Sequence, residues 1–396
     1  MRCTLVFLLA LLGISPAFSQ IDFGDGHDGP LVVSGEVFLA AARTALAAPA
    51  SAGATQITVA SSVGFAVGDE ILIVTMFDPG GGGGTHEFRH LAGISGADLS
   101  LDTPLGHPYP LNPGQAHQVL EVPQFTDVTV ESGGVLTVPA FGGMANPRGG
   151  VLALRCTGAF TVEEGGTVTV DGRGYIGGKG ALYGTYYFPR EMGEAGASPL
   201  GPNLQSRSAN GGGGGSGRDY GGGGGAGHQW SGQPGTSSNF GVPGEAYGWP
   251  NLAVLNMGSG GGGGGAFSVH WPRRGGTGGM GGGVCALAAS SVIIGGSVSC
   301  DANPGQDRVV YHDGSGSAGG GGSGGSLSLQ AGDLVILSTG SVTSRGGSGG
   351  YYQGGDGSAG WVRIDYLNSV SGMTDPPAFV YHQLSSGEIS EGAVWR

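Results

Sequence analysis

The chain has 396 residues, a formal net charge of −13, and 90 glycines beside 21 prolines. This glycine and proline content approaches that of low-complexity chains. However, 39 % hydrophobic and only 11 % charged residues are the opposite of the balance in disordered chains, so we expect a folded core. Lys179 is the one lysine and there is no basic stripe, which argues against binding to a nucleic-acid backbone.

Residues 1–19 are predicted to be a signal peptide. Arg2 precedes an apolar run from Leu5 to Leu12, and Ala17 and Ser19 have the small-x-small spacing of a cleavage site. The apolar run is too short to span a bilayer, and no later stretch reaches the roughly 18 apolar residues that a span needs. We expect a mature protein that is secreted and lies extracellularly or at the cell surface, without a transmembrane segment.

Residues 20–117 are predicted to form an N-terminal β module. Within it, TQITVASSVGFAVGDEILIVTM has the pattern of two strands around a Gly-Asp turn. Residues 37–48 have helix propensity but no clear start cap, so their structure stays open. Asp22, Asp25 and Asp28 are spaced three apart among turn glycines. That pattern is typical either of a Ca²⁺ site, although the spacing is not that of an EF-hand, or of a solvated turn.

Internal repeats dominate the rest of the chain. TVESGGVLTVPA at 129–140 aligns with TVEEGGTVTVDG at 161–172, and related units occupy 282–302 and 324–346, with a half-unit at 360–367. Each unit has about twenty residues in short strands, the size of one solenoid coil. We predict an all-β fold with parallel β-helix or solenoid coils over 118–172 and 282–367 and a C-terminal tail over 368–396. A sandwich of β-hairpins is the alternative.

Period-two alternation within the repeats predicts which side chains face the core. The expected ladder consists of Leu152, Leu154, Val168, Val170, Leu287, Val298 and Leu329. Cys156, Cys285 and Cys300 fall on the same face. They are expected either as buried thiols or with one disulfide between Cys285 and Cys300.

A glycine-rich insertion is predicted over 173–281, and a second glycine-rich loop lies between the later coils. Four tracts, at 211–215, 221–225, 260–265 and 319–322, are nearly pure glycine. Runs in polyproline-II geometry without Cβ atoms can pack side by side and exchange backbone hydrogen bonds. We expect such polyglycine II-like order, with a flexible tether as the alternative.

Aromatic residues are interleaved with glycine, serine and asparagine in these insertions, as in antibody binding loops. The candidate ligand-binding residues are Tyr220, Trp230, Tyr247, Trp249, Trp271 and Tyr311. The alternative is that their rings cover the glycine layer as a local core. Asp171, Asp301 and Arg345 stack at equivalent repeat positions. They are the best candidates for polysaccharide cleavage, but an exposed structural ladder is favoured and no catalytic residue is predicted.

Glycine-rich tracts that leave a β scaffold resemble the polyglycine sandwich of phage tail-fibre tip adhesins. The stretches FGDGHDGPLVVSG and TQITVASSVGFAVGDEILIV resemble exported glycine-rich surface proteins of bacteria and the host-binding fibres of predatory ones. The resemblance implies an adhesive role and carries over no catalytic residue or cofactor.

The expected function is therefore a non-enzymatic adhesin or surface-fibre component that binds a surface glycan or a cell-surface protein. The alternatives are a self-assembling extracellular-matrix protein and a β-helix polysaccharide lyase or hydrolase.

Overall fold

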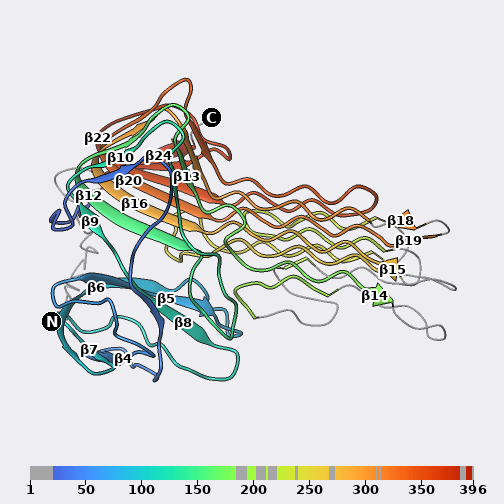
Figure 1. Cartoon of the computed structure of the whole chain (residues 1–396), viewed down its shortest axis with the longest axis horizontal. Coiled ribbons are helices and arrows are strands. Elements are labelled where there is room, and N and C mark those ends of the chain that lie inside the picture. The colour runs from blue at the N-terminus through green and yellow to red at the C-terminus, as the bar shows by residue number, and fades with distance from the viewer. Residues whose placement is uncertain are drawn as a thin grey trace, which may run out of the picture.

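The protein is represented by a computed structural model, which describes residues 21–183, 194–201, 211–212, 221–236, 240–266, 273–308, 310–311, 314–383 and 389–394. These residues form strands, turns and extended runs but no helix. Figure 1 shows a stack of coils beside a smaller antiparallel sheet, with a long arm of wavy runs extending from the coils.

The coils are built from two sheets. The long-strand sheet has the order β1-β10-β12-β16-β20-β22-β23-β24, and β9 also pairs with β12. Its bounds are Leu31–Val33 (β1), Gln124–Phe125 (β9), Val128–Val130 (β10), Val151–Val162 (β12), Val284–Ile294 (β16), Ser326–Ile336 (β20), Trp361–Ser371 (β22), Phe379–Gln383 (β23) and Ile389–Val394 (β24). All of its pairs are parallel except β23 with β24.

The short-strand sheet faces it across the coil interior and is parallel throughout. Its order is Glu36–Phe38 (β2), Val135–Thr137 (β11), Thr167–Thr169 (β13), Ser297–Ser299 (β17) and Ser341–Thr343 (β21). Neighbouring strands of a hairpin sandwich would be antiparallel. The prediction of an all-β fold with parallel coil sheets is therefore confirmed.

The pairing register follows the sequence repeats. Thr129 pairs with Thr161, and Leu287 pairs with both Leu154 and Leu329, as the alignment of repeats requires. All seven residues of the expected ladder belong to one core cluster between the two sheets and are at most 2 % exposed. Because alternate residues of a strand point to the same face, one repeated pattern fills this interior coil after coil.

The three cysteines lie in the same core as free thiols. Of the two expectations, buried thiols and a Cys285–Cys300 disulfide, the structure has the first. Burial raises the pKa of the Cys300 thiol well above its ordinary value, which keeps the group uncharged.

The first coil is formed earlier in the chain than the repeats indicated. Strands β1 and β2 precede the antiparallel sheet, yet they pair with β10 and β11. The chain thus begins a coil, leaves it to build the antiparallel sheet, and returns. At the other end, β22 continues to Ser371 and β23 and β24 extend the long-strand sheet. The predicted boundaries between residues 117 and 118 and between residues 367 and 368 therefore do not coincide with the sheet membership.

The antiparallel sheet has six strands in the order β3-β8-β5-β6-β7-β4. Their bounds are Arg43–Ala45 (β3), Gln56–Thr58 (β4), Glu70–Phe77 (β5), His86–Ser95 (β6), Asp98–Leu101 (β7) and Ala116–Glu121 (β8). Residues 37–48, left open from the sequence, contain no helix but the last two residues of β2 and the whole of β3. Strand β5 is buried along its whole length because one face packs within the module and the other contacts the coils.

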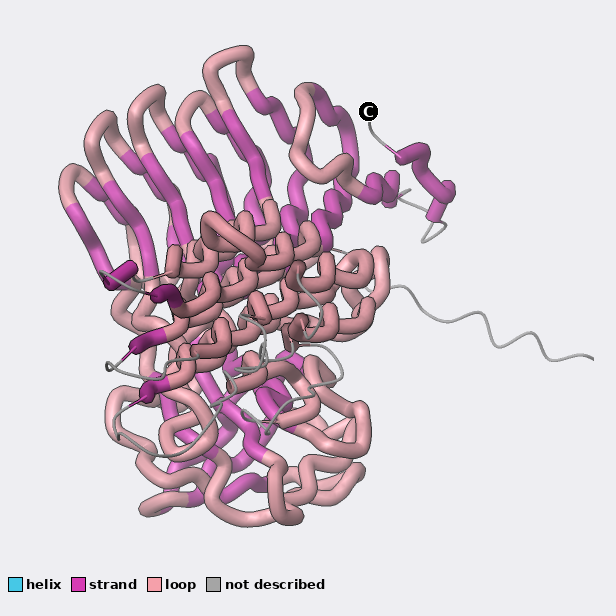
Figure 2. The backbone as a smooth tube through the Cα atoms, turned by 90° about the vertical axis from the view of Figure 1, so that its right-hand side faces the viewer, coloured by secondary structure: helices cyan, strands magenta, loops and turns pink. Residues whose placement is uncertain are grey.

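Every long glycine-rich excursion leaves the coils from the same corner. Residues 174–283, 303–325 and 345–360 each connect a strand of the short-strand sheet to the next long strand, and together we call them the glycine arm. Viewed along the arm in Figure 2, the runs are stacked in rows. Two small antiparallel pairs lie at its far end in Figure 1: Leu182–Tyr183 (β14) with Arg273–Arg274 (β15), and Val310–Tyr311 (β18) with Gly314–Ser315 (β19).

The run from Gly260 to Gly265 shows how the arm is held together. Its N–H groups donate to three neighbouring runs in turn, returning to the same run every third residue. Gly260 and Gly263 donate to Ala197 and Glu194, Gly261 and Gly264 to Gly279 and Gly276, and Gly262 and Gly265 to Gly224 and Gly221, at 2.8–3.0 Å. Its carbonyls accept from Gly178, Ala181, Gly212, Ser317 and Gly320. The whole run is buried, and all six of its N–H groups and five of its six carbonyls are paired with described residues, as burial requires.

Candidate functional site

Two of the six predicted ligand-binding aromatics present exposed rings on the glycine arm. The side chains of Trp230 and Trp249 are each 66 % exposed. Tyr220 and Trp271 lie outside the described residues, and of Tyr311 the structure describes the backbone, in β18. The arm therefore carries exposed indole rings on a backbone whose runs are hydrogen-bonded to one another.

Tyr247, the remaining predicted binding residue, is engaged with the arm itself. Its ring stacks on His228 with 4.3 Å between the ring centroids. Its hydroxyl donates to the Met257 carbonyl at 2.7 Å and accepts from Ser259 Oγ at 2.9 Å. Burial raises the pKa of Tyr247 and lowers that of His228 to about 4. The Tyr247 ring thus covers the glycine layer at the base of the arm, which is the alternative weighed for these aromatics.

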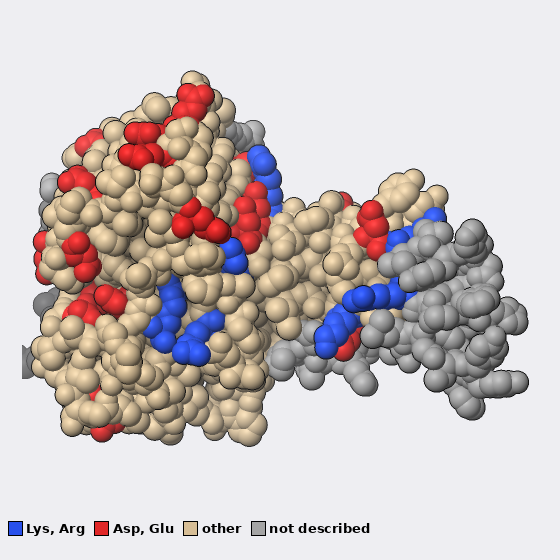
Figure 3. All heavy atoms as spheres, in the orientation of Figure 1, with Lys and Arg blue, Asp and Glu red and all other residues tan. Residues whose placement is uncertain are grey.

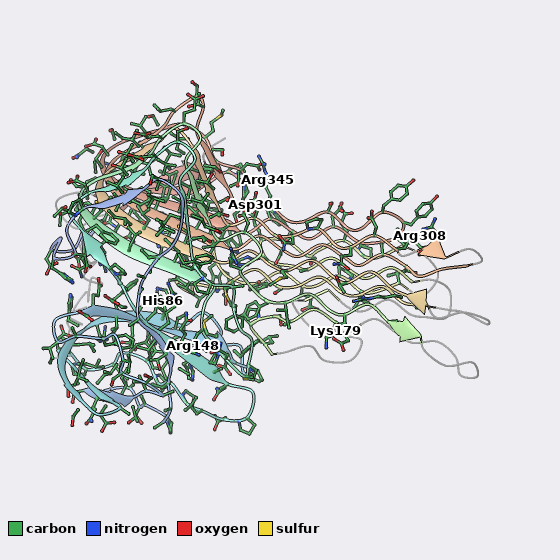
Figure 4. All side chains as sticks on the ribbon, in the orientation of Figure 1. His86, Arg148, Lys179, Asp301, Arg308 and Arg345 are labelled. Carbon is green, nitrogen blue, oxygen red and sulfur yellow. The ribbon has the colours of Figure 1, made fainter. Side chains whose placement is uncertain are left out.

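Tyr351 and Tyr352 form an exposed pair that the sequence reasoning did not select. They are 71 % and 50 % exposed, and their rings meet edge to face at 4.6 Å. The Arg308 guanidinium lies 3.8 Å from the Tyr352 ring centroid, a cation–π contact, and Figure 4 shows Arg308 on the outer half of the arm.

Two backbone conformations beside this pair are unusual. Tyr352 and Gln353 have φ of 64° and 84°, values that cost energy in residues with a Cβ and that cluster at functional sites. The sequence signal was two adjacent tyrosines within a glycine turn, GGYYQGG. We add Tyr351 and Tyr352 to the candidate set on the basis of their exposure.

The acid–arginine stack predicted from the repeats forms at the corner where the arm leaves the coils, as Figure 4 shows for Asp301 and Arg345. The Asp301 N–H donates to Asp171 Oδ1 at 2.6 Å, and the Arg345 N–H donates to Asp301 Oδ1 at 2.6 Å. Arg345 Nε donates to Asp375 Oδ2 at 2.6 Å. Each aspartate thus caps a backbone N–H of the next coil. Burial raises the pKa of Asp301.

The aspartates near the N-terminus are used in local turns. Asp22 accepts from the Gly24 N–H, Asp25 from His27, and Asp28 from the Gln124 N–H at 2.7 Å. The described residues include no group of three or more His, Cys, Asp or Glu side chains placed to hold a metal ion. The structure therefore does not bring the three aspartates of the predicted Ca²⁺ site together.

A groove of about 410 Å³ lies between the antiparallel sheet and the outer face of the long-strand sheet. Ala286, Ala288, Ser328 and Gln330 form its floor, and His86, Phe88, Arg155, Leu252, Leu255 and Arg363 are among the residues that line its sides. This volume lies in the range of small-molecule sites. Sequence reasoning missed the groove because its lining comes from outward-facing positions of separate strands, whose period-two pattern gives the face but not what lies opposite.

Comparisons with known proteins place few constraints on these surfaces. No family model matches the chain, and no curated protein matches its sequence. The described residues contain no helix that is long and apolar enough to cross a membrane.

Among solved structures, the chain is similar to the Gp54 tailspike of Acinetobacter baumannii bacteriophage AP22, determined in complex with A. baumannii capsular saccharide. The identity is 11 % and the TM-score 0.21, and the match covers 90 % of this chain and 59 % of the tailspike chain. At that TM-score the likeness carries no argument about function.

Proposed function

We propose that this chain is an exported, non-enzymatic adhesin or surface-fibre component that binds a surface glycan or a cell-surface protein through aromatic side chains of the glycine arm. The observation that carries the proposal is the combination of exposed Trp230, Trp249 and Tyr351 rings with a buried, hydrogen-bonded glycine layer. Aromatic rings held on a stiff support contribute contact area at a low cost in conformational entropy.

The support is proposed to be a polyglycine II-like layer. The alternation of hydrogen-bond partners with a period of three residues matches the three residues per turn of the polyproline-II helix. A Cβ atom on Gly261 would overlap the Gly320 carbonyl, and one on Gly264 would overlap the Ser317 carbonyl. Such close approach is open only to glycine, which explains the composition of the tracts without invoking a flexible tether.

Recognition by the arm is proposed to rest on ring stacking and hydrogen bonding more than on charge. On the face shown in Figure 3, the part of the arm next to the coils carries almost no charged side chains, and Lys and Arg side chains gather toward its outer end. Aromatic faces pack well against apolar surfaces, and the polar edges of Trp and Tyr donate hydrogen bonds. Tyr220, Trp271 and Tyr311 remain candidates for the same surface, together with Tyr351 and Tyr352.

The stack of Asp171, Asp301 and Arg345 is proposed to be structural. Both aspartates accept backbone N–H groups of the following coil, so their carboxylate oxygens are used to hold successive coils together. This arrangement favours the adhesin over the polysaccharide lyase or hydrolase. Export through the 1–19 signal and a location outside the cell are part of the proposal.

The test is a glycan array probed with the mature protein, in parallel with Trp230→Ala, Trp249→Ala and Tyr351→Ala. Each substitution is expected to weaken binding to the best glycan by about tenfold or more, as for aromatic contact residues. Met373→Ala is the control because this side chain is 71 % exposed and lies outside the arm. Unchanged binding in all three aromatic variants would contradict the proposed surface. A solution mass that grows with concentration would favour the matrix protein.

A further inference from the structure

The groove between the two bodies offers a second binding site that does not use the exposed aromatic rings of the glycine arm, although Leu252 and Leu255 of the arm contribute to its wall. Figure 4 shows His86, on β6, in the junction between the antiparallel sheet and the coils. Ser328 and Gln330, on β20, face the groove from the opposite side. Both bodies contribute to the lining, so the site exists only in the folded chain.

The floor of the groove is shaped as a trough by the sheet register. Ala286 pairs with Ser328, and Ala288 pairs with Gln330, so β16 and β20 present mostly small side chains. The flanking strands β12 and β22 carry Arg155 and Arg363. Strands in a sheet are about 4.8 Å apart, which places the backbones of the flanking strands roughly 14 Å from each other. A single sugar ring fits such a width.

The charges of the two arginines are already neutralised. Arg155 Nε and its terminal nitrogen lie 2.5 and 2.6 Å from the Glu70 carboxylate oxygens. Arg363 makes the same two-point contact with Asp365, at 2.7 and 2.6 Å. Asp22, at the rim, lies 3.8 Å from Arg155 Nε. An anionic ligand would therefore have to displace a paired carboxylate, which is costly for a partly buried ion pair.

Three neutral polar groups in the groove have no hydrogen-bond partner among the described residues: Ser328 Oγ, the Gln330 amide and His86 Nε2. Ser328 is only 9 % exposed. The Nδ1 atom of His86 contacts the Gly84 carbonyl at 3.1 Å, so the neutral ring with a proton on Nδ1 leaves Nε2 as an acceptor. Burial lowers the pKa of His86. A hydroxyl, an amide and an imidazole nitrogen together offer both donors and acceptors.

Apolar side chains complete the lining. Ala286 and Ala288 lie on the floor, and Phe88, Leu252 and Leu255 line the walls. The groove thus combines apolar contact surface with a few convergent hydrogen-bonding groups, the usual composition of a small-molecule site. A pyranose ring has the complementary surface, with a C–H face for the apolar residues and hydroxyl groups for the polar ones.

We propose that this groove binds an uncharged pyranose sugar, with Ser328, Gln330 and His86 Nε2 as its hydrogen-bonding partners. The arginine-bearing strands on both sides limit the width of the trough to one sugar ring. The proposed site does not include the exposed rings Trp230, Trp249 and Tyr351, so the proposal stands whether or not those rings recognise a glycan.

The experiment is calorimetric titration of the full mature chain with the methyl glycosides of glucose, galactose and mannose, with N-acetylglucosamine, with glucuronate and with glucosamine. We expect at least one uncharged sugar to bind and the charged sugars to bind at least tenfold more weakly. Gln330→Ala and His86→Ala are each expected to weaken that binding about tenfold, the effect of losing one good hydrogen bond. His90→Ala is the matched control, since His90 lies on the same strand and does not line the groove.

The thermal unfolding midpoint of each variant separates loss of binding from loss of folding. Binding that falls in Gln330→Ala at an unchanged midpoint supports the site even where His86→Ala is destabilised. The proposal is overturned when no uncharged sugar binds, when glucuronate or glucosamine binds best, or when Gln330→Ala binds as tightly as the unmodified chain. Sugar binding that is lost in Trp249→Ala but kept in Gln330→Ala would assign it to the arm and overturn the groove.

Discussion

The runs of the glycine arm are stacked in the same order as the coils from which they extend. The interactions that hold the stack together differ between the two regions. In the coils, apolar side chains fill the space between two sheets, and residues such as Leu287 and Leu329 are buried by their neighbours above and below. In the arm, the runs approach so closely that a Cβ would overlap a neighbouring carbonyl, and backbone hydrogen bonds link each run to several others. The same stacking thus gives the coils a side-chain core, made of packed apolar side chains. It gives the arm a backbone core, made of closely packed and hydrogen-bonded main chain.

The difference shows what each kind of packing requires of the sequence. A side-chain core tolerates exchange between apolar residues of similar volume, and the core cluster between the two coil sheets indeed mixes Leu, Val, Cys and Ala. A backbone core tolerates no side chain at positions where a Cβ atom would overlap a neighbouring carbonyl, as at Gly261 and Gly264. Substitutions in the two regions should therefore differ in kind as well as in size.

The largest effect is expected for Gly261→Val in the middle of the arm. The valine would overlap the Gly320 carbonyl, and relieving the overlap would separate runs that share many hydrogen bonds. We expect a loss of more than about 3 kcal/mol, at the upper end for overpacking, and fast amide hydrogen exchange across 221–227 and 258–265. Gly35→Val is the control because a Cβ there meets no atom within 4 Å. Protection that survives in Gly261→Val would mean that the arm is not close-packed.

Leu287→Ala tests the side-chain core of the coils. Leu287 is 2 % exposed and lies in the ladder, so the cavity should cost roughly 2–5 kcal/mol in urea unfolding. Ile293→Ala on the same strand, at a side chain that is 36 % exposed, should cost much less. Equal effects of the two substitutions would be inconsistent with the register that places Leu287 inside.

His228 makes the base of the arm sensitive to acid. Burial lowers the pKa of His228 to about 4 in the folded protein, against about 6.5 when unfolded. The unfolded chain therefore binds the extra proton first, and stability is lost as the pH falls from 6.5 towards 4, by about 3 kcal/mol. His228→Gln should flatten this part of the pH profile, whereas His90→Gln should leave it as in the unmodified chain. A slope that is the same in all three proteins would assign the acid sensitivity to other groups.

The smallest effect is expected for Asp301→Asn at the corner between coils and arm. The amide oxygen can still accept the Arg345 N–H, so the loss should be about 1 kcal/mol, that of a weakened hydrogen bond. Any cleavage of polysaccharides by the protein should be unchanged, and Asp333→Asn, at a partly exposed aspartate of β20, serves as the control. A thousand-fold loss of cleavage activity in Asp301→Asn alone would support the enzyme alternative.

The repeats were sufficient to predict the coils from Thr129 onwards. Their strands are alternating and similar to one another, so the alignment of sequences is also the alignment of strands. The first coil was not recognised, because β1 and β2 are separated from the repeat units by the antiparallel sheet. Their partners, β10 and β11, are reached only after the whole antiparallel sheet.

The candidate sites also differ in whether the sequence alone could reveal them. The exposed tryptophans and the acid–arginine stack could be found from composition and repeat position. Tyr247 could not be separated from Trp249 by sequence, although one ring stacks on His228 and the other is exposed. The groove could not be predicted from the sequence. Its polar groups lie on β6 and β20, in different sheets, and they come together only when the antiparallel sheet packs against the coils.

The sequence by itself determined that this chain has a core of alternating strands, since that pattern fixes which side chains share a face, and that its glycine tracts permit a backbone approach closed to other residues. Only the tertiary structure decided which glycine runs are neighbours and which faces enclose a groove. The physical reason is that all glycines offer the same N–H and C=O groups, so no sequence code selects a partner. The stacking of the coils, which places successive excursions side by side, makes that selection instead.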